Sequence, residues 1–506
     1  MHFHYDVCVV GGGPAGGVAA RQLAKLGLST CVIDRGVAAA GHVGVSLPPS
    51  VRTILASIGL AAEETALLQP TGALIIWGLD KEPAYKRYPE AGLTVDRLRF
   101  DALLLSAARA AGAHVFTPAV ASRPVRQEDG SWRISFQHRG RRESIRTRYL
   151  VDAAGRHGIL RRERQPQSCR TFAMYGIWTG VKVDGDESRV EAVADGWAWG
   201  TPLSRSDFLA AVFVDELAIA QSGQSRIFET YHRQLVASKL LRACVHGRLR
   251  SAVKICEASP VPPVSVCGSN HIKVGDAGFC LDPLSSQGVQ RAIVSALQAA
   301  AVVNTTLRTP ANAGLAQAFY EQRLNEAAEQ DRAASGAFYR EQAEETPTPF
   351  WTNRCARLKR PERQSASIDV SLMPRALSLS RDARLGTIGA LVDGLIVPQP
   401  ALFHPELAGP VAFLGECPID RILAPVRSDI SPGELEHAWE ALLPGAAPAN
   451  VLSWLLSRRI LMASTDESWG DKVEIPENKL RSIPPKREGL ASSTRGSNPN
   501  NRTEMI

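Results

Sequence analysis

Residues 5–17, YDVCVVGGGPAGG, decide the fold of this chain. The apolar run at 7–10 predicts a strand that enters a tight turn at Gly11. Gly13 lets the backbone approach a pyrophosphate, and Gly16 lets the following helix pack closely on the sheet. Strand, glycines and helix in this order predict a dinucleotide-binding unit, whereas glycines alone would be compatible with a simple helix cap.

The helix after these glycines supplies the charge for phosphate binding. Its unpaired N-terminal N–H groups and the positive end of its dipole face the phosphates, so the loop needs no lysine. A second strand, residues 29–33, leads to Asp34, which lies 18 residues beyond Gly16. An acid at this position accepts hydrogen bonds from a ribose diol. We assign the adjacent Arg35 to the same site.

Residues 274–288, VGDAGFCLDPLSSQG, form a second glycine-rich signature just past the middle of the chain. Its turn leads into a helix from about Val289, which would place N–H groups and a positive dipole end beside the N1–O2 edge of a flavin, where the reduced ring carries negative charge. The two signatures together predict FAD. The signature residues assigned to it are Gly11, Gly13, Pro14, Ala15, Gly16, Gly275, Asp276, Pro283, Ser286, Gln287 and Gly288.

Length and composition fit an enzyme. A chain of 506 residues has room for two or three domains, and its hydrophobic content of 44% is ordinary for a globular protein. No apolar run approaches the ~20 residues of a membrane span, so we expect no membrane partner. The N-terminus enters its strand without the pattern of a signal peptide, which predicts a cytoplasmic location.

The cysteines predict neither disulfides nor a metal site. There are nine of them, with no CxxC pair and no zinc-like spacing. Cys8 and Cys31 fall within apolar strands, so we expect them to be core residues.

The net charge of +7 is concentrated in one segment. Residues 133–164 hold ten arginines against three acids, an excess equal to that of the whole chain. The segment alternates as strands do and turns at Arg139-Gly140, which predicts a hairpin with its charges on the solvent face. An acidic partner docking there is the alternative. Nucleic acid is not expected, because no binding motif or interleaved aromatics accompany the charge.

The chain as a whole is predicted to be α/β. Residues 1–170 and 270–340 predict a discontinuous Rossmann-like FAD-binding domain with substrate-domain insertions. Residues 171–269 are rich in alternating and aromatic segments, which predicts an antiparallel β-sheet substrate domain over the flavin. Residues 341–394 predict a connector, because Pro347, Pro349 and Pro361 interrupt helices. The basic cluster Arg354–Arg363 within it is expected to help dock a large partner.

A small, mainly α C-terminal domain is predicted over 395–463. Ser431 is suited to cap a helix that starts at Pro432, and residues 449–459 predict a second helix. Two helices followed by an apolar strand resemble a winged-helix-like module that binds peptides or proteins. An appendage with no separate function is the alternative. Residues 464–506 are polar and rich in Pro, Ser and Asn, which predicts disorder.

Over roughly residues 5–340 the pattern resembles the FAD-dependent monooxygenase and halogenase superfamily, which has the para-hydroxybenzoate hydroxylase fold. The resemblance implies that Gly275 and Asp276 hold the ribityl and pyrophosphate part of FAD. It also implies that Pro283–Gly288 lies beside the isoalloxazine ring and that Arg97 contacts the cofactor. Two further cofactor-binding residues are assigned with them, namely Ser46 and Asp152.

Residues 196–202, GWAWGTP, look like the Trp-x-Trp-x-x-Pro signature of flavin halogenases. The resemblance implies that Trp197 and Trp199 line the divide between flavin and substrate. The alternative is that the two tryptophans only cover a hydrophobic core from one face of a strand. Halogenases also carry a lysine that captures hypohalous acid, and the corresponding stretch 70–78 has none. Lys81 and Lys86 lie further along the chain than that lysine should.

Short motifs around Gly44–Pro49, Trp77 and Asp96–Asp101 look like a narrower branch, the flavoprotein monooxygenases of tryptophylquinone cofactor biogenesis, as in quinohemoprotein amine dehydrogenase maturation. This branch implies hydroxylation of a tryptophan within a peptide or protein, a post-translational modification that uses FAD, O2 and a reductant. NAD(P)H or a separate flavin reductase would supply the electrons. Trp77 joins the substrate-binding residues. No catalytic base is assigned, because oxygen insertion needs shielding and positioning more than acid–base residues.

Other classes remain open beside this monooxygenase. A flavin-dependent halogenase of an indole substrate is the nearest, and a non-catalytic binding or escort protein of the same fold is the next. A two-dinucleotide reductase would need a second GxGxxG and usually a cysteine pair, and neither occurs.

Overall fold

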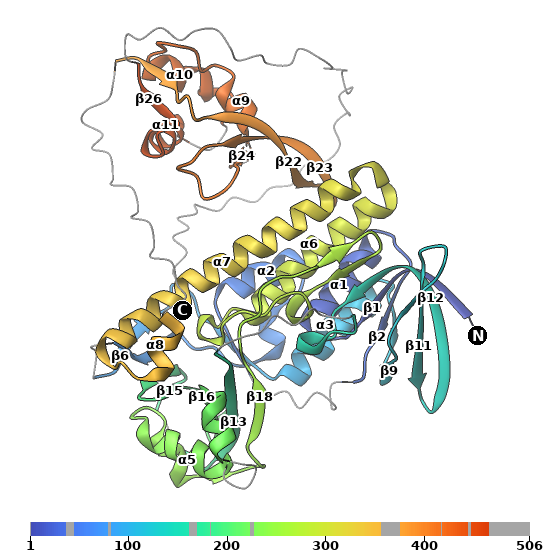
Figure 1. Cartoon of the computed structure of the whole chain (residues 1–506), viewed down its shortest axis with the longest axis vertical. Coiled ribbons are helices and arrows are strands. Elements are labelled where there is room, and N and C mark those ends of the chain that lie inside the picture. The colour runs from blue at the N-terminus through green and yellow to red at the C-terminus, as the bar shows by residue number, and fades with distance from the viewer. Residues whose placement is uncertain are drawn as a thin grey trace. The chain divides into compact units, whose positions relative to one another are not determined.

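The chain folds into two compact units (Figure 1). The computed structural model describes residues 2–36, 45–78, 82–160, 169–182, 184–222, 227–355, 375–415, 417–443 and 447–464. The larger unit contains the described residues of Met1–Glu362 together with Gly389–Pro398, and the smaller unit contains those of Arg363–Ile388 and Gln399–Met505.

The larger unit is built on a mixed sheet with the order β10-β11-β12-β1-β2-β8, in which β12, β1, β2 and β8 are parallel. Strand β1 lies between β2 and β12 and is parallel to both, as a Rossmann-like domain requires. The strands are β1 (His2–Val10), β2 (Thr30–Ile33), β8 (His114–Phe116), β9 (Ala119–Ala121), β10 (Val125–Arg126), β11 (Trp132–His138), β12 (Arg141–Asp152), β19 (Cys267–Gly268) and β20 (His271–Lys273).

Three helices, α1, α3 and α6, and the long helix α7 enclose the main core of this unit. Helix α1 contacts both α3 and α6, and α6 runs beside α7 (Figure 1). Asp96 caps α3, and Leu98 lies on the exposed side of that helix. The bounds are α1 (Pro14–Lys25), α2 (Ser50–Ser57), α3 (Arg97–Ala110), α6 (Gly288–Arg308), α7 (Ala313–Glu345) and α8 (Pro349–Cys355).

The arginine-rich segment forms the expected hairpin. Strands β11 and β12 pair antiparallel, and Arg139 and Gly140 both adopt positive φ at the turn. Arg148 forms an ion pair with Asp6 at 3.0 Å, and Arg146 pairs with Asp129, all on the exposed surface.

A second sheet of eight strands has the order β17-β13-β16-β15-β14-β5-β6, with β18 beside β13. Its neighbours are antiparallel except for β14 and β5. Its strands are β5 (Gly72–Ile76), β6 (Ala84–Arg87), β13 (Thr171–Thr179), β14 (Ser188–Val193), β15 (Gly196–Pro202), β16 (Asp207–Asp215), β17 (Arg248–Leu249) and β18 (Lys254–Glu257). Helices α4 (Glu216–Ser222) and α5 (Ile227–Ala237) pack beside it, and β3 (Val45–Leu47), β7 (Leu93–Val95) and β4 (Ala66–Leu68) form a small third sheet.

The described residues on either side of Pro347 do not form the connector expected over 341–394. Helix α7 continues to Glu345, and Pro349 opens α8 as its first residue, so the prolines separate two packed helices. Trp351 of α8 is fully buried and donates its indole N–H to Val193 and Ala194 carbonyls at 3.1 Å. Burial of this aromatic helix keeps the segment in the larger unit.

The boundary at 395 is also displaced. Strands β22 (Arg384–Val392) and β23 (Leu395–Phe403) form a hairpin whose tip belongs to the larger unit. The Ile396 N–H donates to Thr305 Oγ1 at 2.7 Å, and Asn304 of α6 donates to the Gly394 carbonyl at 2.9 Å.

The smaller unit contains the two predicted helices. Ser431 and Glu434 form a capping box at α10, and Trp439 is fully buried in the unit's core. Whether the unit is winged-helix-like stays a prediction, and the tail beyond 464 lies outside the described residues. Its elements are β21 (Leu377–Leu379), β24 (Phe413–Leu414), β25 (Cys417–Pro418), α9 (Ile419–Leu423), α10 (Pro432–Glu440), α11 (Pro448–Ser457) and β26 (Leu461–Ala463).

Candidate FAD site and active-site cavity

The first signature is shaped by backbone contacts that only glycine allows. Gly11 adopts φ +105°, and a Cβ there would lie 2.3 Å from the Ala153 carbonyl oxygen. A Cβ at Gly16 would lie 1.9 Å from the Gly11 carbonyl oxygen. These contacts pull the start of α1 against the end of β1, which is the close helix–sheet packing expected from the sequence.

Gly13 is different, because a Cβ there would meet no protein atom within 4 Å. Gly13 is also the N-cap of α1, and no side chain caps that helix; Pro14 follows at its first position. The helix therefore presents uncapped N–H groups and an open cradle at the same place, which fits a pyrophosphate.

Asp34 shapes this turn as well as ending β2. Its Oδ1 accepts the Gly12 N–H at 2.7 Å, and its Oδ2 accepts the Gly36 N–H at 2.8 Å. Each oxygen keeps a further lone pair, so ribose binding by Asp34 remains a prediction. The neighbouring Arg35 is exposed.

The second signature meets the first. Gly275 adopts φ +55°, and a Cβ there would lie 2.9 Å from Ala15 of α1 and 3.3 Å from Ala292 of α6. Its N–H donates to Ser295 Oγ at 3.0 Å. Asp276 follows with an exposed side chain. Residues about 260 positions apart thus lie side by side, and their joint binding of FAD stays a prediction.

The turn before α6 is fixed by Asp282. Asp282 Oδ1 accepts the Leu284 N–H at 3.0 Å, and the turn closes at Ser286, which adopts φ +52°. Gln287 precedes the first residue of α6 without capping it through its side chain, and a Cβ at Gly288 would meet no atom within 4 Å. Uncapped N–H groups and open space at this helix end suit a flavin edge that gains negative charge.

Buried polar groups from α7 support this turn, and sequence reasoning missed them. Asp331 Oδ2 accepts the Asp282 N–H at 2.9 Å, and the Tyr339 hydroxyl donates to Asp282 Oδ2 at 2.8 Å. Burial raises the pKa of Asp282 to about 6, opposed by its hydrogen bonds to Leu284 and Tyr339. Asp331, Ser335 and Tyr339 recur every four residues on one buried helix face, and that spacing was the available signal.

Three further residues expected to bind the cofactor have hydrogen-bond partners within the protein. Arg97 forms a two-point ion pair with Asp101 on α3, with N–O distances of 3.1 and 3.0 Å. Asp152 accepts the N–H groups of Ala154, Ile159 and Leu160, so its carboxylate orders the loop after β12. The Ser46 hydroxyl bonds to that of Ser188 at 3.1 Å. Their contact with FAD stays a prediction.

The tryptophans gather on one face of the second sheet. Trp197 and Trp199 share a face of β15, and Trp197 stacks on Phe213 with ring centroids 3.7 Å apart. Trp197 is buried, and its Nε1 has no hydrogen-bond partner among the described residues. Trp77 is also buried and donates to the Phe338 carbonyl at 3.0 Å. Leu284 of the flavin-side turn belongs to the same cluster.

A cavity of about 350 Å³ adjoins the second signature. Its apolar walls come from Pro260, Val261, Pro262 and Leu281, and its polar walls from Thr171, Asp282, Asp331, Ser335, Tyr339 and Arg354.

Arg354 corrects an expectation. It was grouped with the basic cluster up to Arg363 as a docking surface, yet its side chain is only 7% exposed. The guanidinium donates to Asp215 at 2.6 Å and to Thr171 Oγ1 at 2.8 Å, and it lies 3.7 Å from the centre of the Phe350 ring. Residues 356–363 lie outside the described residues.

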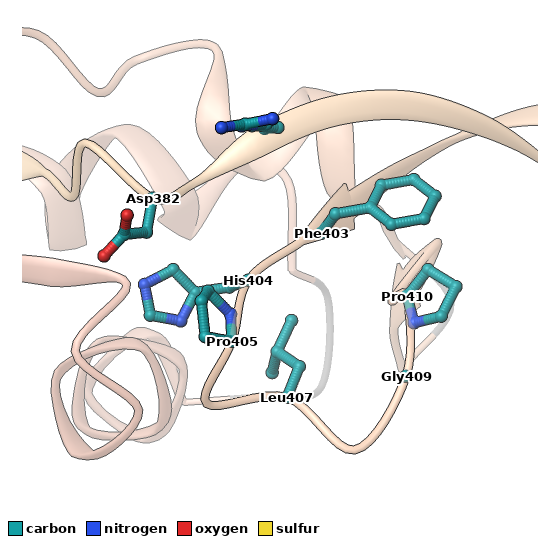
Figure 2. Close-up of a pocket in the computed structure, with 8 residues that line it drawn as sticks. Asp382, Phe403, His404, Pro405, Leu407, Gly409 and Pro410 are labelled. Carbon is teal, nitrogen blue, oxygen red and sulfur yellow. The ribbon is translucent and has the colours of Figure 1, made fainter.

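A second cavity of about 370 Å³ lies wholly within the smaller unit. Figure 2 shows the His404 ring on the side of Asp382 and the Phe403 ring on the side of Pro410. His404 Nε2 lies 3.1 Å from Ser380 Oγ, which fixes the ring.

Membrane-spanning helices and metal-binding clusters are both absent from the described residues. None of their helices is long and apolar enough to span a membrane. They contain no cluster of three or more His, Cys, Asp or Glu side chains placed to hold a metal ion.

Comparisons with known proteins agree with this site. Residues 4–215 match the FAD binding domain family. The tryptophan 2-halogenase of Chondromyces crocatus is 31% identical over 337 residues, which cover 62% of this chain and 64% of that enzyme. This chain thus spans slightly less than two thirds of that relative's length.

Two solved structures share the fold. The flavin-dependent halogenase CmlS superposes with a TM-score of 0.75 at 20% identity, covering 90% of this chain and 96% of that one. The peptidyl tryptophan dihydroxylase QhpG, essential for tryptophylquinone cofactor biogenesis, superposes with a TM-score of 0.71 at 23% identity, covering 90% and 99%.

The fold is thus shared with a flavin-dependent halogenase and a peptidyl tryptophan dihydroxylase. Residues 4–215 carry the FAD binding domain, and FAD is the cofactor. The open backbone at Gly13 and Gly288 and the two uncapped helix ends fit that cofactor.

Proposed function

We propose that the protein is an FAD-dependent monooxygenase that hydroxylates an aromatic substrate, and that this substrate is a tryptophan side chain within a peptide or protein. The observation that carries the choice of hydroxylation is strand β5, whose sequence GALII lacks the lysine that the halogenase resemblance requires. The dihydroxylase with the same fold supports the choice of substrate.

The reaction inserts one oxygen atom of O2 into an aromatic C–H bond, and the other leaves as water. Two electrons come from NAD(P)H or from reduced flavin supplied by a reductase. FAD, when bound, supplies the activated oxygen. Gly11 to Gly16, Asp34 and Arg97 would hold its dinucleotide part, and Asp276 its ribityl chain.

The chain's own residues would shield the reacting groups from water and position the flavin. The N–H groups at the start of α6 would stabilise negative charge on the flavin edge. The buried cluster of Trp77, Trp197 and Tyr339 excludes water from the space between the second sheet and α7.

The smaller unit would hold the peptide. Its cavity combines an aromatic ring, Phe403, with the charges of Asp382 and Arg384 (Figure 2), a composition suited to a peptide segment. Phe403→Ala should raise KM for a tryptophan peptide several-fold and leave KM for N-acetyltryptophanamide unchanged. The exposed Arg421→Ala in the same unit is the matched control.

The main test is mass spectrometry of a tryptophan-containing peptide incubated with the FAD-loaded protein, a reductant and 18O2. A gain of one or two 18O atoms on the indole is expected. Unmodified peptide, with free tryptophan oxidised instead, would contradict the peptide substrate.

Halogenation is the second candidate, and two observations favour it. The most similar curated relatives are halogenases, and Lys86 of β6 pairs with Ala73 of β5. Strand alternation places residue 73 on the same face as Ile75 and Trp77, so its cross-strand neighbour Lys86 belongs to the face of the sheet that carries Trp77. Chloride or bromide in the assay should give oxygenated product only. A halogenated indole that disappears in Lys86→Met would favour the halogenase.

A further inference from the structure

The turn before α6 is tied to helix α7 through Asp282, whose side chain is buried. Asp282 Oδ1 accepts the Leu284 N–H of the turn at 3.0 Å, and Oδ2 accepts the Tyr339 hydroxyl of α7 at 2.8 Å. A second tie uses the main chain, because Asp331 of α7 accepts the Asp282 N–H at 2.9 Å. The turn ends at Ser286 in the left-handed region, with φ +52°, so contacts of this kind have to hold its conformation.

Packing fixes the position of the Tyr339 hydroxyl. The side chain is buried, its ring centroid lies 5.9 Å from that of Trp351, and the Arg354 guanidinium lies 6.0 Å from the ring centre. Arg354 is held in turn by Thr171 of β13 and Asp215 of β16. Burial raises the pKa of Tyr339 well above its usual value, so the hydroxyl keeps its proton and donates a hydrogen bond to Asp282.

The Tyr339 hydroxyl stabilises the charged form of Asp282. Burial raises the pKa of Asp282 to about 6, and the hydrogen bonds from Leu284 and Tyr339 oppose that effect. Two further charges face this carboxyl, namely Asp331, which raises its pKa, and Arg354, which lowers it. The groups that face Asp331 in turn are Ser285, Arg291 and Arg332. A hydrogen bond to a carboxylate favours its ionised form, so without the Tyr339 hydroxyl the pKa of Asp282 would move further up toward neutral pH.

An ionised Asp282 holds the turn more firmly than a protonated one. A charge-assisted hydrogen bond is about twice as strong as a neutral one, so the bond from Leu284 weakens once the carboxyl takes up a proton. The main-chain tie to Asp331 does not use this carboxyl, so the turn stays attached to α7 when the Tyr339 hydroxyl alone is lost. The uncapped N–H groups of α6 follow directly after the turn, so their direction depends on it.

We propose that Tyr339 is a positioning residue for FAD. By holding the Asp282 carboxylate, it keeps the turn before α6 in the conformation that receives the flavin edge, and protonation of Asp282 loosens that turn. This role depends on FAD as the cofactor and is independent of the reaction proposed above.

The test measures the dissociation constant of FAD from about pH 5 to about pH 8, by following flavin fluorescence as the FAD-loaded full-length protein is diluted. The affinity of the wild type should fall about 10-fold as the pH drops through about 6. Tyr339→Phe keeps the ring and should move this fall upward by about one pH unit or more. Asp282→Asn resembles the protonated acid, so it should bind FAD about 10-fold more weakly than the wild type near pH 8 and lack the fall. Adding Tyr339→Phe to Asp282→Asn should change nothing further.

Tyr320→Phe is the matched control, because this buried hydroxyl of the same helix donates to the Lys273 carbonyl at 2.8 Å and not to Asp282. Its pH profile should equal that of the wild type. An unshifted profile in Tyr339→Phe, the same shift in Tyr320→Phe, or a further loss of affinity in the double variant would overturn the proposal.

The wild-type profile decides the matter if Tyr339→Phe does not fold. A fall near pH 6 that Asp282→Asn abolishes would support the proposal, and a wild-type affinity without that fall would overturn it. A shifted profile in a protein that forms no hydroxylated product would refute the proposed reaction and leave the role of Tyr339 standing.

Discussion

The two glycine signatures reach the same cofactor by different means. The first depends on local contacts: a Cβ at Gly16 would meet the Gly11 main chain, and the partly exposed Asp34, which directly follows β2, accepts the Gly12 N–H. The second is braced by buried side chains, since Asp282 is held by Tyr339 and Asp331 from α7. The first signature thus specifies its turn through neighbouring residues, whereas the second depends on a helix that lies about 50 residues further along the chain.

The largest effect should come from breaking the first signature by sterics. Gly16→Val would place a Cβ 1.9 Å from the Gly11 carbonyl oxygen, so α1 would have to leave β1. We expect a loss of more than about 4 kcal/mol in the free energy of unfolding, and little folded protein. Circular dichroism melting checks this, and a normal melting temperature would show that the contact is not as tight as described.

Gly13→Val should separate folding from binding. A side chain there meets no protein atom, so the melting temperature of the apoprotein should stay within a few degrees of the wild type. FAD affinity should fall by at least about 100-fold, because the side chain takes the pyrophosphate space. Gly314→Ala, another glycine with open space, is the control and should retain FAD. Full FAD occupancy in Gly13→Val would place the cofactor elsewhere.

The second signature alone should make stability depend on pH. Because burial raises the pKa of Asp282 to about 6 in the folded protein, while an unfolded aspartate titrates near 3.9, the native state binds the extra proton between these values. Stability should therefore fall as pH rises from about 4 to 6, by about 2 to 3 kcal/mol, and then level off.

Urea unfolding of apoprotein across this range, compared with Asp282→Asn, measures that contribution. The variant should lack this part of the slope. Parallel curves for the two proteins would mean that Asp282 ionises normally and that the two signatures do not differ in this respect.

The smallest effect is expected outside both signatures. Arg148→Ala removes an ion pair with Asp6 whose side chains are 61% and 29% exposed, so unfolding free energy should change by less than about 1 kcal/mol. FAD binding should not change. A loss comparable to that of the glycine variants would mean that the arginine-rich hairpin supports the site and is not a solvated face.

The difference between the signatures also explains what could be predicted. The sequence specifies Gly11 to Gly16, the capping of α3 and α10 and the arginine hairpin, because these depend on neighbouring residues. It did not reveal Asp331, Tyr339 or Arg354, because their role arises only when α7 and α8 pack on a turn some 50 residues earlier in the chain. Pro347 and Pro349 led to the wrong prediction of a connector for the same reason. They do interrupt the helix locally, but the burial of Trp351 packs the next helix against the larger unit.

Helix α7 adds a mechanical consequence. Its 33 residues form a rod of about 50 Å that touches the first sheet through Tyr320, the cavity through Asp331 and the turn after β5 through Gln342. A single inserted residue between Tyr320 and Asp331 would turn the later contacts by about 100° and shift them by about 1.5 Å. The contacts of α7 with the sheet, the cavity and the turn after β5 therefore all depend on one helical register. We expect insertions and deletions to be excluded between these contacts and tolerated at the ends of the helix.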